Sequence, residues 1–436
     1  MLNVEVLILV VLVFLFLECG SSCTLPSPFL QVLSPLASGM PEEPRFSGDL
    51  DEDETFWRDH ASWLREKGYQ LRPRYQPDWK PSWLAKKSSS RFYSEDGSRA
   101  KEPYHLMDAL RVSDGMLLML KKLEVENLSE PTRELRMNQI LLSGTLESPQ
   151  NHCIPIYEIL NLPEDEHQCI VVMPFLEHWW PRWWNLPFST IGEAVGFLQQ
   201  LFEGVQTLHH HHIAHNDIKW DNVMVDSAPL YSRPMHPTQR GTSYDWKHHV
   251  SPKSITRHPV RYFLIDFDLT EQYDPKYGPA RQFPGYGGDR SVPEFKAHPS
   301  QPCDPFPVEI YRLGNLIRRF MMSTQRVRED GDERLGKVRY NPSFNFLSDL
   351  VTDMTQDDPA KRPDIDEVVK RFDEIVHRLG YFKLRSQFWP GHSGENWFVR
   401  TLWKTPRHFV SQVINTLGRY PPVPPTPGLP KGRKGR

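Results

Sequence analysis

The stretch HNDIKWDN, residues 215–222, decides the fold that the sequence predicts. It places a carboxylate (Asp217), a cation (Lys219) and an amide (Asn222) within one short loop. Phosphoryl transfer needs this set of groups, because a proton acceptor, a positive charge facing the phosphoryl group and a neutral oxygen ligand for a metal ion must converge. A polar turn after a helix is the ordinary alternative interpretation of the same residues.

A second stretch, YFLIDFDL at residues 262–269, is an apolar strand pattern that ends in Asp266. The two stretches together resemble the catalytic loop and the Asp-Phe-Gly element of eukaryotic-type protein kinases. The resemblance implies an α+β fold of two lobes, a small β-rich N-terminal lobe and a larger helical C-terminal lobe. It also implies that Asp217 is the catalytic base, that Lys219 stabilises the transferred phosphoryl group, and that Asn222 and Asp266 bind Mg²⁺, while His215 is structural.

The ATP-binding residues that the resemblance implies lie further towards the N-terminus. Lys121, at the end of LMLK, resembles the strand lysine that contacts the α- and β-phosphates, and Glu134 resembles its helical partner. Lys122 competes with Lys121, but strand alternation points the two lysines to opposite faces, and Lys121 follows the apolar run. In VVMPFL, Met173 and Phe175 would line the adenine pocket.

Two later motifs extend the resemblance. SVPEF at residues 291–295 resembles the Ala-Pro-Glu that closes the activation segment, and DPAKRP at residues 358–363 resembles a late Asp-Pro-x-x-Arg-Pro element. In the family, Glu294 and Arg362 would form a buried ion pair, which costs roughly 3–5 kcal/mol to break. EIYRLG at residues 309–314 matches the central helix of the helical lobe, with Glu in place of Asp.

Three departures from the family pattern bear on nucleotide binding and regulation. No G-x-G-x-x-G precedes Lys121, so the phosphate-covering loop is degenerate or rebuilt. Asn216 replaces the Arg that receives an activation-loop phosphate, which argues against activation by phosphorylation. Asp268 replaces a glycine, which stiffens the hinge that follows Asp266. A Pro/His/Ser-rich insert, residues 227–259, separates the two catalytic stretches and is expected to be a surface loop.

The sequence divides into five parts. The protein kinase domain is expected at residues 105–380, with its N-lobe at 105–173 and its C-lobe at 177–380. The parts around it are expected to be an apolar signal-like or anchor-like segment at 1–23, a linker at 24–55, an N-terminal extension at 56–104 and a C-terminal extension at 381–436 that ends in a disordered Pro-rich basic tail.

Local patterns predict several secondary-structure elements. An amphipathic helix is plausible over 56–68, and Asp114-Gly115 predicts a hairpin over 112–123. Thr190 with Glu193 matches a capping box at the start of the helix 190–208. Further elements are expected as strands at 154–160 and 169–173 and as helices at 131–142, 308–322, 344–355 and 364–379.

Composition limits the functional classes. The net charge of −3 and the pI near 6.7 give no reason to expect nucleic-acid binding. The five cysteines show neither metal-ligand spacing nor a disulfide framework, and the consecutive histidines 209–212 cannot easily converge on one zinc ion. The apolar run at residues 6–17 could mediate membrane association, but it lacks a preceding Lys or Arg and leaves the localisation open.

The leading hypothesis is an ATP- and Mg²⁺-dependent kinase that phosphorylates Ser/Thr hydroxyls of a protein substrate. A pseudokinase scaffold is the alternative, favoured by the missing glycine loop and opposed by the full set of catalytic groups. A small-molecule phosphotransferase ranks third, because such enzymes lack the SVPEF and DPAKRP elements. The segments LRPRYQPDWKPSW (71–83) and NHCIPI (151–156) also resemble divergent kinase-like proteins of mushroom-forming fungi (basidiomycetes), which implies no particular substrate.

Overall fold

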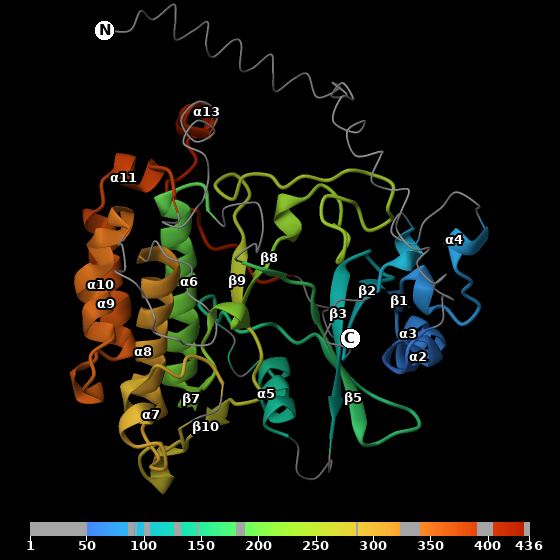
Figure 1. The fold of residues 1–436 in the computed structure, drawn as a ribbon, viewed down its shortest axis with the longest axis horizontal. Coiled ribbons are helices and arrows are strands. Elements are labelled where there is room, and N and C mark those ends of the chain that lie inside the picture. Colours follow the sequence, from blue (N-terminus) through green and yellow to red (C-terminus); the bar gives the residue numbers. More distant parts are fainter. Residues whose placement is uncertain are drawn as a thin grey trace, which may run out of the picture.

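The structure is a computed structural model of the 436-residue chain and combines a five-stranded antiparallel sheet with eleven α-helices among the residues that it describes (Figure 1). The described residues are 50–85, 91, 94–99, 105–125, 132–144, 146, 148–179, 188–284, 287–322, 341–389 and 404–430. The sheet lies towards one end of the molecule and most of the longer helices lie towards the other.

The five-stranded sheet has the strand order β1-β2-β3-β5-β4, and every neighbouring pair is antiparallel. Its strands are β1 (Tyr69–Leu71), β2 (Leu106–Arg111), β3 (Leu117–Glu124), β4 (Glu158–Asn161) and β5 (Gln168–Pro174). The hairpin expected at Asp114-Gly115 is present, because β2 and β3 pair across this turn and Gly115 has a φ of 70°. Its first strand ends at Arg111, earlier than the pattern predicted.

Alternation along β3 sends successive side chains to two different cores. Leu118 and Leu120 pack with Trp57, Leu64 and Tyr69 on one side. Leu123 packs on the other side, in the larger core that continues under the helices. The sheet therefore has an apolar layer on both faces.

The helical part is built around the long buried helix α6. The helices that follow the sheet are α5 (Arg133–Leu142), α6 (Ile191–His210), α7 (Pro293–Ala297), α8 (Pro305–Ile317), α9 (Ser348–Met354), α10 (Ile365–Arg378), α11 (Tyr381–Arg385) and α13 (Thr405–Leu417). A π-helical turn, Arg318–Met322, continues α8, and a 3₁₀ segment, Pro342–Leu347, precedes α9. The helices expected from the sequence at 131–142, 308–322, 344–355 and 364–379 are thus confirmed, with small shifts at their ends.

The capping box expected at α6 forms only in part. The Thr190 side chain accepts from the Glu193 N–H, as the pattern predicted. The Glu193 carboxylate instead accepts from the Ser189 N–H (2.6 Å) and from the N–H and hydroxyl of Thr256 (2.9 and 2.6 Å). A long-range partner replaces the local one, because Thr256 belongs to the insert and reaches this carboxylate from outside the helix.

Two small sheets position the loop 215–222 and the segment that contains Asp266. The first has the order β6-β8-β9, formed by β6 (Glu177–His178), β8 (Val223–Asp226) and β9 (Arg261–Leu264). The second pairs β7 (Ile213–Ala214) with β10 (Glu271–Gln272). Residues 215–222 run from β7 to β8, and Asp266 follows β9, so the pairing of β8 with β9 brings the two stretches side by side.

The N-terminal boundaries expected from the sequence are wrong. Helix α2 (Glu52–Asp59) begins inside the segment expected to be a linker, since Asp51 and Glu54 form a reciprocal capping box. After it come α3 (Ala61–Glu66), two 3₁₀ turns, Pro73–Tyr75 and Glu95–Gly97, and the short helix α4 (Ser82–Ala85). Because β1 pairs with β2 and the two helices pack against the sheet, the described residues of 51–71 form one packed unit with the five-stranded sheet.

The insert 227–259 is also more than a surface loop. It contains the 3₁₀ turn Ala228–Leu230 and reaches back to the sheet, where the Tyr244 hydroxyl donates to Asp108 (3.2 Å). His236 is fully buried and lies 3.4 Å from Glu95. In Figure 1 this segment arches from β8 and β9 towards β1 and β2.

The described part of the Pro-rich tail, residues 421–430, packs against the protein, contrary to expectation. Pro422 and Pro424 lie beside α6, where the Pro422 carbonyl occupies the space beside Gly192. Arg261 donates to the Pro427 carbonyl (2.6 Å). The expected strand at 154–160 is shorter than predicted and is reduced to β4, whereas the strand at 169–173 is confirmed as β5.

No helix among the described residues is long and apolar enough to cross a membrane. The expected signal-like or anchor-like segment 1–23, and residues 24–49 of the expected linker, lie outside the described residues.

Candidate active site

Lys121 on β3 and Glu134 on α5 form the ion pair that the sequence predicted, with 2.5 Å between Nζ and Oε1. Burial raises the pKa of Glu134, even though the charge of Lys121 opposes this shift. Lys122 points to the opposite face of the sheet, where its Nζ lies 4.7 Å from the ring centre of Phe56. Alternation along β3 therefore separates the two lysines, and only Lys121 faces α5.

His215 holds the start of the catalytic loop. Its Nε2 lies 3.0 Å from the Ile265 carbonyl, and its Nδ1 lies 3.3 Å from the Asp217 N–H. This geometry fits a neutral ring that donates through Nε2 and accepts through Nδ1. Burial lowers the pKa of His215 and favours that neutral form. The ring thereby ties Asp217 to the strand that leads to Asp266.

The side chains of Lys219 and Asn222 both contact one carboxylate oxygen of Asp217, Oδ2. Asp217 Oδ2 accepts from Asn222 Nδ2 (2.8 Å) and lies 2.9 Å from Lys219 Nζ. Burial lowers the pKa of Lys219, but the hydrogen bond and charge of Asp217, with further negative charge from Asp266, outweigh it and raise that pKa. The neighbouring carboxylates thus favour the charged form of Lys219.

The other oxygen of Asp217, Oδ1, is buried and has no hydrogen-bond partner among the described residues. Gly287 and Gly288 cover it: a Cβ atom added to Gly287 would lie 2.3 Å from Oδ1, and one added to Gly288 would lie 3.1 Å away. Both glycines have positive φ angles, 69° and 45°. Only residues without a Cβ fit this turn, which lies directly on the free oxygen of the carboxylate.

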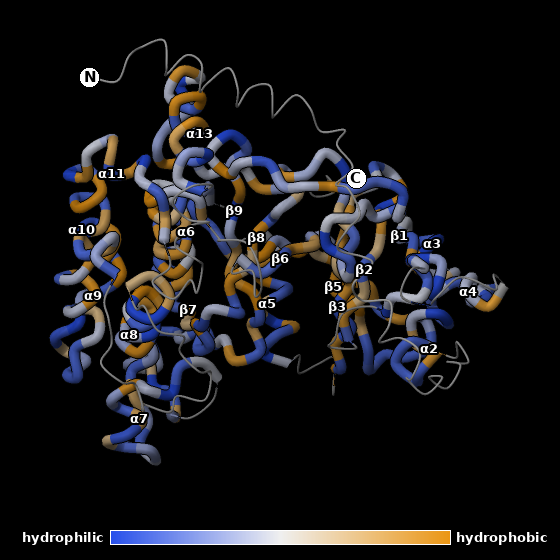
Figure 2. Tube along the Cα trace, turned by 45° about the horizontal axis from the view of Figure 1, so that its top comes forward, coloured by the Kyte–Doolittle hydropathy of each residue, from blue (hydrophilic) through white to orange (hydrophobic). Residues whose placement is uncertain are grey.

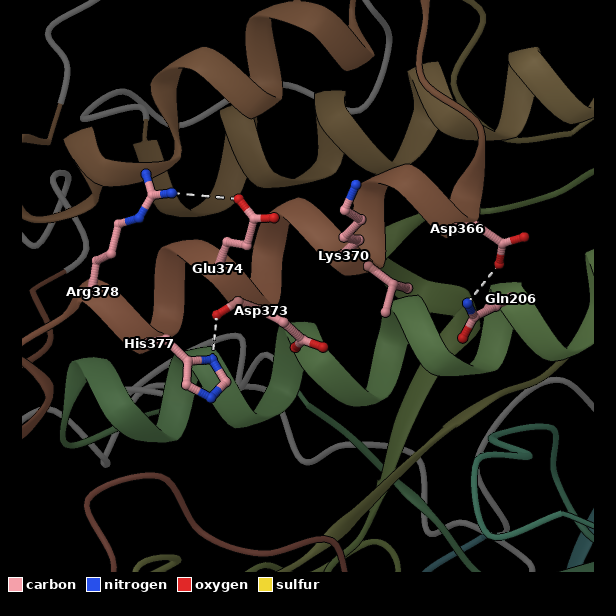
Figure 3. A pocket seen from close by; sticks show the side chains of 8 residues that line it. Gln206, Asp366, Lys370, Asp373, Glu374, His377 and Arg378 are labelled. Carbon is pink, nitrogen blue, oxygen red and sulfur yellow. Dashed lines mark hydrogen bonds and ion pairs between the residues drawn. The ribbon is translucent and has the colours of Figure 1, made fainter.

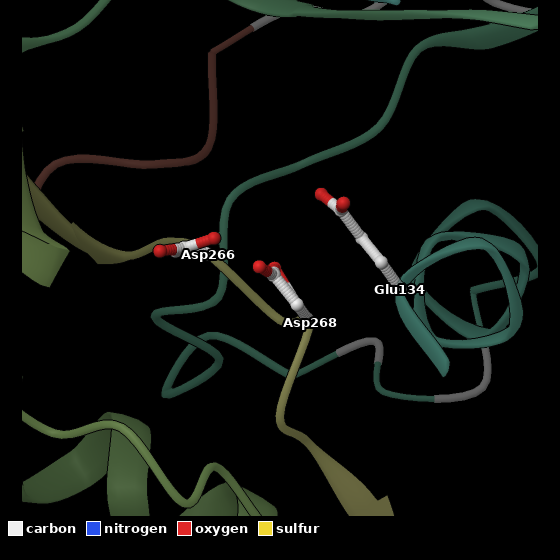
Figure 4. A group of neighbouring side chains, drawn as sticks. All are labelled: Glu134, Asp266 and Asp268. Atoms are coloured by element: carbon white, nitrogen blue, oxygen red, sulfur yellow. The ribbon is translucent and has the colours of Figure 1, made fainter. Parts of the chain in front are cut away.

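Three carboxylates gather beside Lys121. Asp266 and Asp268 come from the loop after β9 and Glu134 from α5 (Figure 4), and one oxygen of each lies within 4.8 Å of the others. Asp266 Oδ1 lies 3.9 Å from Lys121 Nζ, and the residue has a left-handed φ of 69°. Burial, together with the neighbouring Asp268, raises the pKa of Asp266 to about 7.

This donor set fits a hard divalent cation. Carboxylate and amide oxygens are the ligands that Mg²⁺ prefers, and one Lys leaves the negative charge of three carboxylates incompletely balanced. Asn222 Nδ2 is used by Asp217, whereas no described residue donates to Asn222 Oδ1. Asp266, Asn222 and Asp268 are therefore the residues that could hold a metal ion. Asp268 was noted in the sequence only as a departure from the family pattern.

The Glu294–Arg362 ion pair predicted from the sequence is present and lies outside this cluster. Arg362 Nη1 and Nη2 donate to the two carboxylate oxygens at 2.7 and 2.6 Å, and the guanidinium also donates to the Gln356 and Pro307 carbonyls. The pair joins α7 to the segment before α10. The pair fixes the end of the segment that contains the Gly287-Gly288 turn, which covers Asp217.

Side chains of helix α8 hydrogen-bond to the backbone of the loop 215–222. The fully buried Glu309 carboxylate accepts from the Asn216 N–H (2.6 Å), and its other oxygen lies 2.8 Å from His209 Nε2. Arg312 donates to the Asn216 carbonyl, and Asn315 donates to Asp289, the residue after the glycine turn. The backbone of Asn216, with φ 63°, is thus held on both sides.

Met173 and Phe175 lie where β5 ends. Met173 pairs with Met119 across the sheet and is packed against the larger core, on the same face of β5 as Val171, the partner of Lys121. The Phe175 N–H donates to the Leu117 carbonyl (3.4 Å). Both residues are half-buried.

An open groove between α6 and α10 contains none of the predicted site residues (Figure 3). Its side chains largely pair with one another. Asp366 accepts from Gln206 (2.7 Å) and lies 2.8 Å from His210 Nε2, and Arg378 lies 3.4 Å from Glu374. The groove is a solvated surface of paired charges and has no geometric relation to the catalytic loop.

Sequence reasoning missed several residues around the site: Gly287, Gly288, Asp289 and Arg312. The Gly287-Gly288 pair is visible in the sequence as a turn signal before SVPEF. Nothing in the sequence shows, however, that this turn lies on Asp217, since the two are 70 residues apart in the chain.

No known family model matches the chain, and no curated protein sequence matches it.

Proposed function

We propose that the chain is an ATP-dependent protein kinase of the Ser/Thr type, with a two-lobed, kinase-like fold. One observation carries the proposal: the Lys121–Glu134 pair from the sheet domain and the Asp217–Lys219–Asn222 cluster from the helical part both adjoin Asp266. A sheet in the order β1-β2-β3-β5-β4 beside a mainly helical part supports the fold proposal.

On the nucleotide side, Lys121 is placed to meet anionic phosphates. Glu134 orients its ammonium group, which lies between the sheet and the loop after β9. Met173 and Phe175, at the end of β5, line the position expected for the adenine ring. A point charge held by a partner carboxylate suits phosphate binding, because the lysine is oriented before the ligand arrives.

On the acceptor side, Asp217 is the proton acceptor. Its Oδ2 is engaged by Asn222 and Lys219, which leaves Oδ1 to take the proton of a substrate hydroxyl. Lys219 faces the same space and offsets the negative charge of the transferred phosphoryl group. In the present conformation Gly287 covers Oδ1, so the glycine turn must move before a hydroxyl can reach it.

Asp266, Asn222 and Asp268 would hold Mg²⁺. When bound, the ion supplies positive charge that offsets the phosphate oxygens and orients them. Asp266 and Asp268 themselves place two carboxylates next to Glu134, the partner of Lys121, in a site that is partly buried from water.

A pseudokinase scaffold is the second candidate, and two observations favour it. Asp217 Oδ1 is covered, and β1 and β2 are joined not by a glycine-rich turn but by residues 72–105, held by the buried Arg72–Asp108 pair. The complete set of catalytic groups favours the enzyme. A small-molecule phosphotransferase is less supported, because the Glu294–Arg362 pair fixes a segment that such enzymes lack.

The experiment that tests the proposal measures ATP binding by calorimetry and phosphate transfer from γ-labelled ATP, with the chain itself, casein, an aminoglycoside and choline as acceptors. Wild type is compared with Asp217→Asn, Asp266→Asn and the control Asp349→Asn, an exposed carboxylate on α9. We expect Mg²⁺-dependent transfer in wild type and the control, loss of transfer with retained binding in Asp217→Asn, and weakened Mg²⁺-dependent binding in Asp266→Asn.

The three candidates give different results in that experiment. Wild-type binding without transfer would contradict the enzyme and leave the scaffold. Absence of ATP binding would contradict both nucleotide-dependent forms. Transfer to an aminoglycoside or choline, but not to any protein hydroxyl, would favour the small-molecule phosphotransferase.

A further inference from the structure

The C-terminal extension, residues 381–436, has a charge opposite to that of the rest of the chain. It contains ten Lys or Arg residues and a single acidic residue, Glu395, whereas the other residues contain 42 Lys or Arg and 54 Asp or Glu. A locally basic segment on an otherwise acidic chain favours contact with an anionic surface.

The same extension exposes large apolar side chains. Phe382 is 87% exposed and Leu417 is 79% exposed, values that a side chain belonging to a core would not show. Five exposed side chains on or next to α11 and α13, called here the α11–α13 face, are Tyr381, Phe382, Phe409, Leu417 and Tyr420. Exposed apolar groups that gather in one place mark interaction surfaces, while single ones need no explanation.

Contacts and helical spacing place three of these side chains, Tyr381, Phe382 and Phe409, close to one another. The Tyr381 hydroxyl is 2.9 Å from Thr416 Oγ1, and the ring of Tyr381 is 5.7 Å from that of Phe382. Phe409 is seven residues before Thr416 and therefore shares its side of α13. Figures 1 and 2 place α11 and α13 at one end of the molecule, with apolar stretches along α13.

The sides of α13 that flank Phe409 and Thr416 contact the rest of the chain. Val410 and Asn415 are buried, and Arg257 donates to Asn415 Oδ1 (2.8 Å). Arg385 donates to the Tyr420 carbonyl and so links α11 to the end of α13. The α11–α13 face is thus fixed to the body of the protein and cannot turn its apolar groups inward.

Cations adjoin this face. Arg407 and Arg419 are exposed at the two ends of α13, and no acidic residue occurs in the described stretches 381–389 and 404–430.

We propose that the α11–α13 face docks on the surface of an anionic lipid membrane. Aromatic and leucine side chains enter the headgroup region, and the flanking Lys and Arg side chains contact the anionic headgroups. A second copy of the chain fits less well, because a two-fold contact would bring the same positive charges together. The inference does not depend on phosphoryl transfer.

The test is vesicle flotation of the full-length chain with phosphatidylcholine vesicles, with and without phosphatidylserine. Variants are Phe382→Ser/Phe409→Ser/Leu417→Ser, Arg407→Gln/Arg419→Gln and the control Val112→Ser, an apolar side chain exposed on the β2–β3 turn. Thermal unfolding checks that each variant folds.

We expect wild type and control to bind only vesicles with phosphatidylserine, and less at high salt. Loss of each cation should weaken partitioning about fivefold, and the triple serine variant should weaken it by at least about tenfold. Wild-type binding in the triple variant would overturn the inference. If only the charge variant loses binding, and heparin or DNA competes fully, the face binds polyanions instead. If no variant loses binding, the contact lies elsewhere, for example in residues 6–17.

Discussion

The catalytic loop and the N-terminal cover of the sheet are built in opposite ways. In the loop, Asp217, Lys219 and Asn222 come from one stretch of eight residues. In the N-terminal cover, residues 51–99, the buried pairs join distant positions. Arg72 pairs with Asp108, and Tyr244 of the insert donates to the same carboxylate from 136 residues away. The polar groups of the loop are close together in the sequence, whereas the buried polar contacts around β2 join residues that are far apart in the sequence.

The difference predicts that the loop sets the proposed activity and that the N-terminal cover sets stability. A loop that carries its own partners can keep its chemistry while the surrounding chain changes. The N-terminal cover includes β1 and part of its connection to β2, and the Arg72–Asp108 pair ties it to β2, the strand that pairs with β3. Variants in the loop should therefore change the rate of phosphate transfer, and variants in the N-terminal cover should change the free energy of unfolding.

The largest expected effect is on the rate. Lys219→Met removes the cation beside Asp217 Oδ2 and leaves the fold intact, since the Lys219 side chain is about one-third exposed. We expect phosphate transfer to fall by roughly 10²- to 10³-fold, with little change in the free energy of unfolding. Steady-state transfer and urea denaturation measure the two quantities, and a loss of stability without loss of rate would reverse the comparison.

A large effect on stability is expected in the N-terminal cover. Asp108→Asn leaves the buried Arg72 guanidinium without its main counter-charge. We expect the free energy of unfolding to fall by about 3 kcal/mol, while the transfer rate per folded molecule stays near that of wild type.

The matched control is Asp59→Asn, which breaks the exposed Arg58–Asp59 pair. Exposed pairs contribute about 0–1 kcal/mol, so urea denaturation should distinguish the two variants clearly. Equal losses would show that the Arg72–Asp108 pair does not act as a buried pair.

A smaller effect tests the cover on Asp217. Gly287→Ala and Gly278→Ala both place a Cβ at a positive φ, at a cost of about 1–2 kcal/mol, but only the first meets another group, Asp217 Oδ1. We expect carbodiimide labelling of Asp217, read by peptide mass spectrometry, to rise in Gly287→Ala alone. Equal labelling in both variants would show that the turn does not cover the carboxylate.

The smallest expected effect is the pH dependence of the free energy of unfolding. His215 in the loop and Glu54 in the N-terminal cover should act in different pH ranges. Burial lowers the pKa of His215 below its usual 6.5. The unfolded chain then binds the proton more readily, so stability falls as the pH drops below 6.5, by at most about 1.4 kcal/mol per pH unit. His152, whose pKa is also lowered by burial, contributes in the same window.

Glu54 in the N-terminal cover acts at lower pH. Burial raises its pKa, but the hydrogen bond and charge of Arg74 outweigh this and lower it below the usual 4.5. The stabilisation that the Glu54 carboxylate gives to the folded state is present above pH 4.5. It is lost as the pH falls further through the lowered pKa. Urea denaturation across this range should show that His215→Asn reduces the first loss of stability and Glu54→Gln the second. A single loss insensitive to both variants would contradict the assignment.

The sequence predicted the parts of the site that depend on short spacing. Alternation along one strand distinguished Lys121 from Lys122, and the interval from Asp217 to Asn222 predicted a loop whose side chains meet in the structure. The Glu294–Arg362 pair was predicted only through the family resemblance, because its partners are 68 residues apart.

The rest could not be predicted from local patterns, for physical reasons. β1 is only three residues long and is defined by its pairing with β2, across a connection with two 3₁₀ turns and α4. The insert looked like a loop because its order comes from Tyr244, His236 and Thr256, which contact other parts of the chain. The cover on Asp217 depends on where the Gly287-Gly288 turn folds back, which tertiary packing decides.

The most direct test of the central claim compares two adjacent lysines. Lys121 faces Glu134 and Asp266, and Lys122 lies over Phe56 on the other face of the sheet. Calorimetry of Mg²⁺-ATP binding should show at least about a tenfold loss of affinity in Lys121→Met, with Lys122→Met close to wild type. Equal affinities in the two variants, or a greater loss in Lys122→Met, would contradict the placement of the nucleotide site on the Lys121 face.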